Sequence, residues 1–186
     1  MGLLKRPGVL DIGNAIDWEH EDNQGLVFRA NGIADGAGSR LTDLAGGRHG
    51  TFIGGPLWEP TQRGDIALRF NGTNTSVAIP DIRPGTERLT VVATVDTLVS
   101  SDNGSFRGVV VNDEGWGLFL INGVLATYDW PAGATRNSTS GDLRGTRRRI
   151  GLSVVLGVAS SGTFFLDGRP AGTFTQTAST YLGNPR

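Results

Sequence analysis

Carboxylates gather near the N-terminus, and paired carboxylates are the chemistry of glycoside hydrolysis. The group comprises Asp17, Glu19, Glu21 and Asp22. A glycosidase needs two such groups held about 5–10 Å apart across the scissile bond. These four precede the first predicted strand, and the acids further along, Asp65, Asp96 and Asp113, fall at the ends of predicted strands. We therefore expect a solvated acidic segment, no catalytic residue and no enzyme.

Other catalytic and metal-binding patterns are weak. The chain has no Cys, and its two histidines, His20 and His49, are far apart in the sequence, whereas a zinc site needs three or four ligands with short spacing. The serines leave a Ser-His-Asp triad open, but no Gly-x-Ser-x-Gly elbow is present. The only lysine is Lys5, so there is no phosphate-binding Gly-x-x-x-x-Gly-Lys loop. We predict no metal centre.

Aromatic and basic residues are the better candidates for binding. Tyr128 and Trp130 flank an expected strand end, where rings can stack on sugar faces or anchor a protein interface. The basic cluster at 144–149 suits a sulfated glycan, a phosphate or an acidic partner, or is simply a solvated strand start. The candidate contacts to a glycan or a partner are Tyr128, Trp130, Arg144 and Arg147.

Short strands must position these residues. The clearest, 89–95, alternates Leu89, Val91, Ala93 and Val95 on one face with threonines and Val92 on the other. Asn122-Gly123 predicts a hairpin with a type I′ turn, and Asp167-Gly168 predicts a second hairpin. No window has helical periodicity. Strands are expected at 26–30, 49–53, 56–58, 65–70, 89–95, 106–111, 116–121, 124–128, 149–156, 163–166 and 171–177. This spacing predicts an all-β sandwich or barrel.

Composition limits the classes of function. Hydrophobic residues make up 38% of the 186 residues, which is enough for a folded core, and the net charge of −1 argues against nucleic-acid binding. The longest apolar run, 150–159, is about half a membrane span, so no membrane association is expected. The N-terminus lacks the apolar stretch of a signal peptide. We expect a protein made in the cytoplasm and kept there or assembled into something larger.

Several segments resemble a known family in the correct order. Ala67-Leu68-Arg69-Phe70-Asn71-Gly72 resembles the motif A-L-x-F-D-G of laminin-G-like, concanavalin-A-like jelly-roll domains of the bacterial and phage type. Further matches lie at 25–28, 43–51, 89–94, 115–118, 165–168 and 181–184. The resemblance implies a two-sheet antiparallel jelly-roll sandwich at 25–186, preceded by an irregular arm at 1–24. It also places His49 in a turn, where a structural hydrogen bond is expected, and it implies that Trp58 and Trp116 pack in the core.

Two departures from the family pattern matter. Asn71 and Asn74 stand where many relatives have acidic residues, and neutral amides bind calcium weakly at best, so we expect no cofactor, with weak calcium binding left open. Relatives also continue beyond the segment resembling 181–184 with a last strand that pairs beside the first. We therefore expect the domain to lack this strand. The gap beside 26–30 would be closed by a longer chain, by a neighbouring subunit or by the arm.

The residues at 16–20 resemble the opening of such domains in phage reading frames. We therefore expect a non-enzymatic structural protein of a phage virion, a capsid decoration or tail component, located in the virion. Its partners would be other virion proteins or copies of itself in a homo-oligomer. The alternative is a carbohydrate-binding module for cell-surface or extracellular glycans. Arm contacts to a neighbour are expected from Leu10, Ile12, Ile16 and Trp18.

Overall fold

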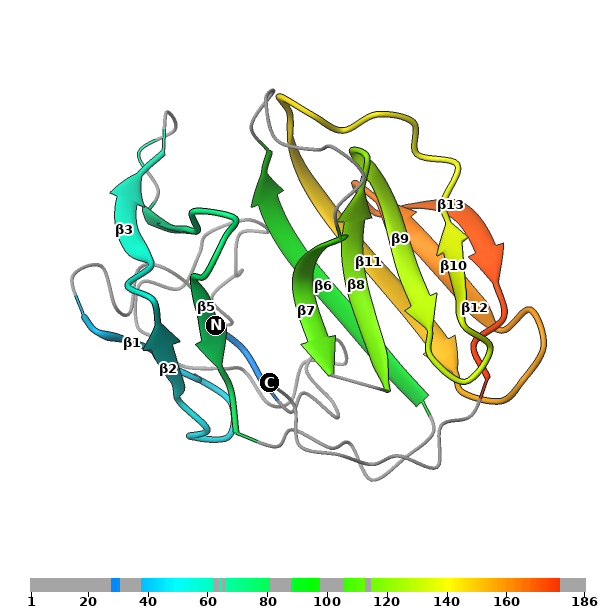
Figure 1. Ribbon diagram of the computed structural model, residues 1–186, viewed down its shortest axis with the longest axis horizontal. Coiled ribbons are helices and arrows are strands. Elements are labelled where there is room, and N and C mark those ends of the chain that lie inside the picture. The colour runs from blue at the N-terminus through cyan, green and yellow to red at the C-terminus, as the bar shows by residue number, and fades with distance from the viewer. Residues whose placement is uncertain are drawn as a thin grey trace, which may run out of the picture. The chain divides into compact units, whose positions relative to one another are not determined.

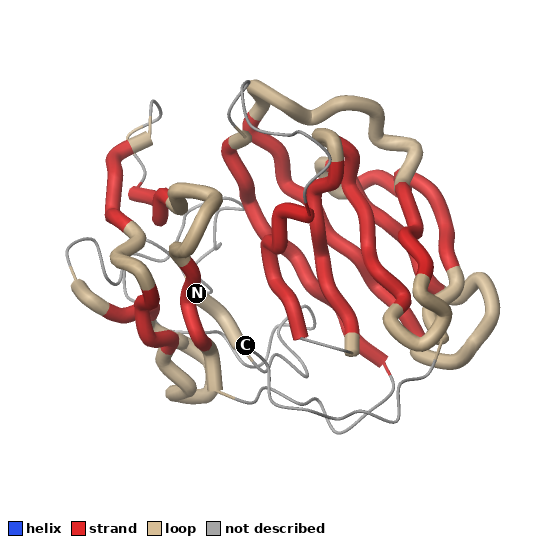
Figure 2. Tube along the Cα trace, in the orientation of Figure 1, coloured by secondary structure: helices blue, strands red, loops and turns tan. Residues whose placement is uncertain are grey.

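The computed structural model describes residues 28–30, 38–61, 64, 66–80, 88–97, 106–112 and 115–177. The described part is all-β, which confirms the predicted class: it contains thirteen strands in four sheets and no helix (Figures 1 and 2). It accordingly holds no helix long and apolar enough to cross a membrane. The predicted arm contacts Leu10, Ile12, Ile16 and Trp18 lie outside the described residues.

The chain divides into two compact units. The smaller comprises residues 1–70 and 75–77 and contains two small sheets. One orders β1 (Arg40–Leu41), β2 (Gly50–Ile53) and β5 (Ser76–Ala78), and the other pairs β3 (Leu57–Pro60) with β4 (Ile66–Arg69). Trp58 is only half-buried here: it stacks on Phe52 at 5.8 Å and donates from Nε1 to the Gly38 carbonyl at 2.7 Å.

The larger unit, residues 71–74 and 78–186, holds two four-stranded antiparallel sheets. Sheet I has the order β10-β9-β8-β7, formed by β7 (Phe106–Asn112), β8 (Trp116–Ile121), β9 (Val124–Asp129) and β10 (Ala134–Asn137). Sheet II has the order β13-β12-β11-β6, formed by β6 (Arg88–Asp96), β11 (Arg147–Val155), β12 (Gly162–Leu166) and β13 (Arg169–Phe174).

The inward faces of sheets I and II enclose one core. Leu118 and Leu125 of sheet I pack with Ile150, Leu152 and Phe164 of sheet II, all nearly inaccessible to solvent. Every second side chain of a strand points to the same face of the sheet, which explains why these residues lie in the core. The predicted inward face of 89–95 packs on this core, as does Trp116. The larger unit is therefore a two-layer β-sandwich.

The hairpin turns follow their sequence signals. Asn122 and Gly123 both have positive φ, 52° and 77°, as do Asp167 and Gly168, at 51° and 80°. Type I′ turns require positive φ at both central positions, which Asn and Gly tolerate and most residues do not. These two predictions are confirmed.

Some elements differ from expectation. β1, β5 and β10 were not predicted, because they are only two to four residues long and lack an apolar alternation of their own. Of the expected strand at 26–30, residues 28–30 are described and form no strand. The backbone of Arg29 instead bonds the turn at 43–44, where its N–H meets Asp43 Oδ1 at 3.0 Å and its carbonyl accepts from Leu44 at 2.7 Å.

Candidate functional site

Four aromatic rings form a cluster on the outer face of sheet I, called here the aromatic cluster. It comprises Phe106 of β7, Phe119 of β8, Tyr128 of β9 and Trp130 just beyond β9. Phe106 lies edge-on to both Phe119 and Tyr128, with ring centroids 5.6 and 5.5 Å apart. Trp130 lies 5.2 Å from Tyr128 and 5.9 Å from Phe119. The rings therefore form one contiguous group.

The cluster faces away from the core. Leu118 and Leu120 point inward, so Phe119 between them points outward, and Phe106 is paired with Ile121 of the same outward parity. Phe119 is nevertheless only 6% exposed, whereas Phe106 is 48% exposed. The other rings cover Phe119, and the cluster offers Phe106, Tyr128 and Trp130 to solvent.

Gly117 makes the cluster possible. A Cβ built on Gly117 would lie 2.3 Å from Cε2 of Phe119, because the ring lies directly over this glycine. No two carbon atoms can approach so closely, so any side chain at position 117 must push the ring aside. Gly117 was not singled out by the sequence, because an isolated strand glycine does not show which ring lies above it.

We expect Gly117→Ala to displace Phe119 and disperse the aromatic cluster. Overpacking of this kind costs about 1–3 kcal/mol, and ring contacts of about 0.5–1.5 kcal/mol each are lost with it. Thermal unfolding should show a lower midpoint, and the near-ultraviolet circular dichroism of the native state should weaken. Gly133→Ala is the matched control for stability, because a Cβ there meets no atom within 4 Å, although its φ of 60° adds local strain. Unchanged near-ultraviolet dichroism in Gly117→Ala would contradict this packing.

Beneath Tyr128 and Trp130 the chain buries a charge. Asp129 shares the inward parity of Leu125 and is fully inaccessible to solvent. Its Oδ2 accepts from Arg136 Nη2 at 3.2 Å and from the Thr177 backbone N–H and hydroxyl at 3.3 and 3.1 Å. Asp129 Oδ1 and Arg136 Nε are buried without a hydrogen-bond partner. This pair joins β9, β10 and the segment after β13.

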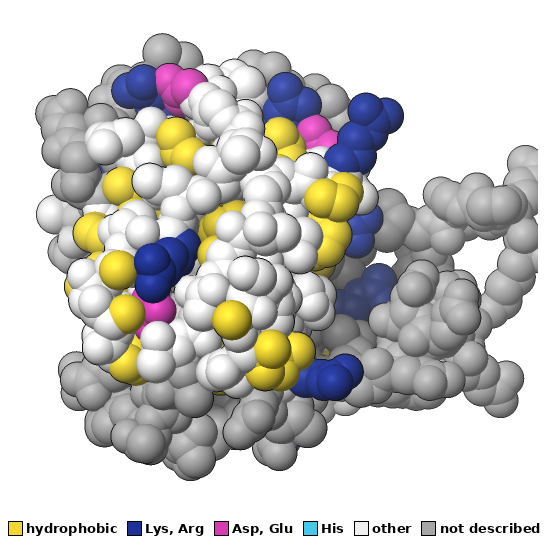
Figure 3. Space-filling view, turned by 90° about the vertical axis from the view of Figure 1, so that its right-hand side faces the viewer, with side chains coloured by type: hydrophobic (Ala, Val, Ile, Leu, Met, Phe, Trp, Pro, Cys, Tyr) yellow, Lys and Arg dark blue, Asp and Glu magenta, His cyan; other side chains and the backbone are white. Residues whose placement is uncertain are grey.

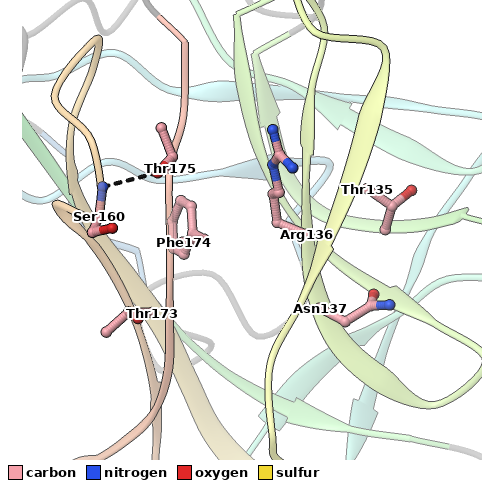
Figure 4. A pocket seen from close by; sticks show the side chains of 7 residues that line it. All are labelled: Thr135, Arg136, Asn137, Ser160, Thr173, Phe174 and Thr175. Atoms are coloured by element: carbon pink, nitrogen blue, oxygen red, sulfur yellow. Dashed lines mark hydrogen bonds between the residues drawn. The ribbon is translucent and has the colours of Figure 1, made fainter.

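A groove lies above this pair, between the edge strand β10 of sheet I and the edge strand β13 of sheet II. Its volume is about 500 Å³. In Figure 4, Arg136 and Phe174 point into the space between the two strands, while Thr135, Asn137 and Thr173 point away from it. Figure 3 shows this side of the larger unit, where charged side chains are scattered among uncharged ones. Sequence reasoning missed the groove, because it depends on two strands far apart in the chain.

The predicted contact residues fall into two places. Tyr128 and Trp130 lie together in the aromatic cluster. Arg144 lies instead beside the Asn122-Gly123 turn, since a Cβ on Gly123 would meet its Cγ at 2.9 Å, and that turn is at the opposite end of β9. Arg147 begins β11 in sheet II, opposite Asp96. The structure thus does not bring the arginines to the aromatic pair.

Two of the four arginines in the basic cluster are paired with carboxylates. Arg144 holds Asp142 through several hydrogen bonds, which lower the pKa of that carboxyl below its usual value. Arg148 pairs with Asp167 at 2.8 Å. The backbone N–H of Arg149 and then the Arg148 side chain lower the pKa of Asp167 in the same way. These two exposed pairs stabilise turns.

In the smaller unit, Asp43 organises the turn that resembles the family motif. Its carboxylate accepts backbone N–H groups from Arg29, Ala45, Gly46 and Arg48 at 2.8–3.0 Å. Burial raises the pKa of Asp43, but these four hydrogen bonds outweigh it and hold the pKa below the ordinary value of 3.8. His49 Nδ1 accepts from the Asp43 N–H at 3.2 Å, which confirms its predicted structural role.

The side-chain amides of the loop at 71–74 form hydrogen bonds within the loop. Asn71 Oδ1 accepts from the backbone N–H groups of Thr73 and Asn74, and Asn71 Nδ2 donates to Asn74 Oδ1 at 2.7 Å. Within the described ranges, no three carboxylate, imidazole or thiol groups gather as metal ligands. Weak calcium binding at this loop stays a prediction.

Comparison with family models, with curated proteins and with solved structures finds no match to this chain. The function is therefore argued from the aromatic cluster, the groove and the buried pair.

Proposed function

We propose that the protein is a non-enzymatic structural protein of a phage particle, a capsid decoration or tail component, that binds a neighbouring protein through its sandwich. The aromatic cluster carries the proposal. Aromatic residues are enriched at the centres of protein interfaces, where a few of them supply most of the binding free energy. Phe106, Tyr128 and Trp130 form such a centre on a rigid sheet, and the arm's resemblance to phage sequences indicates the kind of assembly.

The test is retention on the particle. Particles purified on a density gradient from a culture that produces the full chain should carry the protein. Phe106→Ala should reduce its retention by about tenfold or more, as expected for loss of an interface anchor. Val158→Ala is the matched control, because Val158 is 49% exposed against 48% for Phe106 and lies outside the cluster. Equal retention of both variants would contradict the proposal, as would release of reducing ends from β-glucans by the pure protein.

A second candidate function, carbohydrate binding to cell-surface or extracellular glycans, is favoured by the pairing of Tyr128 with Trp130. Amphipathic rings presented together can stack on the apolar faces of sugars. A glycan array probed with the isolated protein separates the two functions. Binding that is lost in Phe106→Ala and kept in Val158→Ala would favour the glycan, whereas an array without binding leaves the protein partner.

A further inference from the structure

We infer that the groove between β10 and β13 accepts an extended peptide segment of a partner chain as an added strand, with an inward-pointing carboxylate meeting Arg136. The inference deepens the proposed interaction role by naming how a partner is held. It rests on four observations: two edge strands, the direction of their backbone groups, a hydrogen bond that joins the two strands at one end, and an incompletely paired arginine.

Each edge strand has a pairing partner on one side only, among the described strands. β10 pairs with β9, and β13 pairs with β12. At one end the two edges already meet, because the Thr139 N–H donates to the Ala171 carbonyl at 2.9 Å. Gly172 permits this approach: its φ is 109°, and a Cβ there would lie 3.3 Å from the Thr139 nitrogen. From this hydrogen bond the two strands diverge, and Arg136 and Phe174 lie in the space between them.

The backbone groups that face the groove can be assigned by alternation. The Ser138 N–H points to β9, since it donates to the Leu125 carbonyl, whereas the Thr139 N–H points to β13. Because N–H and C=O directions alternate along a strand, Thr135 and Asn137 also direct theirs toward the groove. Two residues beyond the end of β13, the Gln176 carbonyl accepts from the Gly157 N–H, on the side away from the groove.

Counted back from the Gln176 carbonyl, the same alternation directs the backbones of Thr175 and Thr173 at the groove, without crossing the irregular pairing at 171–172. The side chains of Thr135, Asn137 and Thr173 point away from the space in Figure 4, so these residues line it with backbone. Rows of backbone donors and acceptors of this kind are what an added strand pairs with.

Arg136 sets the chemistry of the occupant. Its Nη2 is held by Asp129 and its Nε is buried without a partner. The side chain is 35% exposed and points into the groove beside Phe174 (Figure 4). A guanidinium that is oriented by a buried carboxylate and partly exposed in the groove favours a carboxylate as its second partner. Since Phe174 lies beside it, the methylenes of a glutamate would contact the ring while the carboxylate reaches Arg136.

The test uses nuclear magnetic resonance on the isolated full chain with the capped pentapeptide Thr-Val-Glu-Val-Thr. At millimolar peptide, we expect the amides of Thr135, Asn137, Thr173 and Thr175 to shift and to gain protection from hydrogen exchange. The Gln analogue should bind about fivefold or more weakly, because it lacks the charge that Arg136 meets. A peptide N-methylated at every residue should not bind, because neither of its edges keeps an N–H group that can pair with a strand.

Two variants and one control variant complete the test. Asn137→Pro removes a groove-facing N–H at an edge, where proline is tolerated, and should abolish binding of the Glu peptide. Arg136→Gln should abolish the preference for Glu over Gln, and Arg149→Gln, the same change outside the groove, should preserve it. If Arg136→Gln does not fold, the Glu and Gln peptides on the wild-type chain decide the same point.

Absence of shifts at the four amides, or equal binding of the N-methylated peptide, would overturn the inference. Equal affinity of the Glu and Gln peptides would overturn the role of Arg136. Because the peptide is tested on the isolated protein, a protein absent from any particle would overturn the proposed function and leave this result standing.

Discussion

Replacing Asp129 by alanine should lower the free energy of unfolding of the larger unit by about 3–5 kcal/mol. Asp129 is fully buried, and its removal leaves the Arg136 guanidinium without its buried counter-charge. It also leaves the Thr177 N–H and hydroxyl without their acceptor. Urea unfolding followed by tryptophan fluorescence measures the loss, because Trp116 lies in the core beside sheet I.

A double replacement separates the cost of leaving Arg136 unpaired from the cost of losing the ion pair as a whole. Asp129→Leu combined with Arg136→Met removes both charges and should recover much of the stability, since apolar pairs of similar volume commonly replace buried ion pairs without loss. Asp142→Ala is the control: it also breaks an ion pair with arginine, but an exposed one, and should scarcely shift the urea midpoint. If Asp129→Ala unfolds at the same urea concentration as Asp142→Ala, the buried pair does not stabilise the sandwich.

Asp43→Asn should cost about 2–3 kcal/mol of local stability in the smaller unit. The Asp43 carboxylate accepts four backbone N–H groups, and the substitution replaces one of its oxygens by an amide NH2 group, which donates and would face those N–H donors. The pKa of Asp43 is lowered in the folded state. Its contribution is therefore fully present above the ordinary pKa and is lost as the pH falls through the folded value. Hydrogen exchange at the amides of Ala45, Gly46 and Arg48, corrected for intrinsic rates, reports this loss.

In the wild-type chain the protection of these amides should fall on acidification below the ordinary pKa of 3.8, whereas in Asp43→Asn it should be low throughout. Glu59→Gln is the control, because it removes a carboxylate from the same unit whose exposed partner is Arg69. Protection in Asp43→Asn as strong as in Glu59→Gln would contradict the assigned role of the turn.

The sandwich was predictable where local rules decide the outcome. Alternation along 89–95 and 149–156 identifies the inward faces, and Asn-Gly and Asp-Gly identify two turns whose φ values follow from residue type. The short strands β1, β5 and β10 were missed, because partners elsewhere in the chain fix them. Local periodicity contains no information about such partners.

The same limit of local sequence rules applies to the candidate site. Tyr128 and Trp130 were identified from residue type and position, and they do lie together. Phe106 and Phe119 were assigned only to strands, because their meeting depends on the order of β7, β8 and β9 in sheet I. An available signal was missed for Asp129: it shares the parity of Leu125, so a buried charge and a cationic partner should have been expected.

We propose that the aromatic cluster is the surface by which this protein is held in an assembly. Oxidative footprinting with hydroxyl radicals, read by mass spectrometry on purified particles and on the isolated protein, tests it directly. We expect Phe106, Tyr128 and Trp130 to be oxidised in the isolated protein and protected about tenfold or more in the particle, as burial at an interface centre requires. Val158 should be oxidised equally in both. Equal oxidation of the three rings in the two states would contradict the claim.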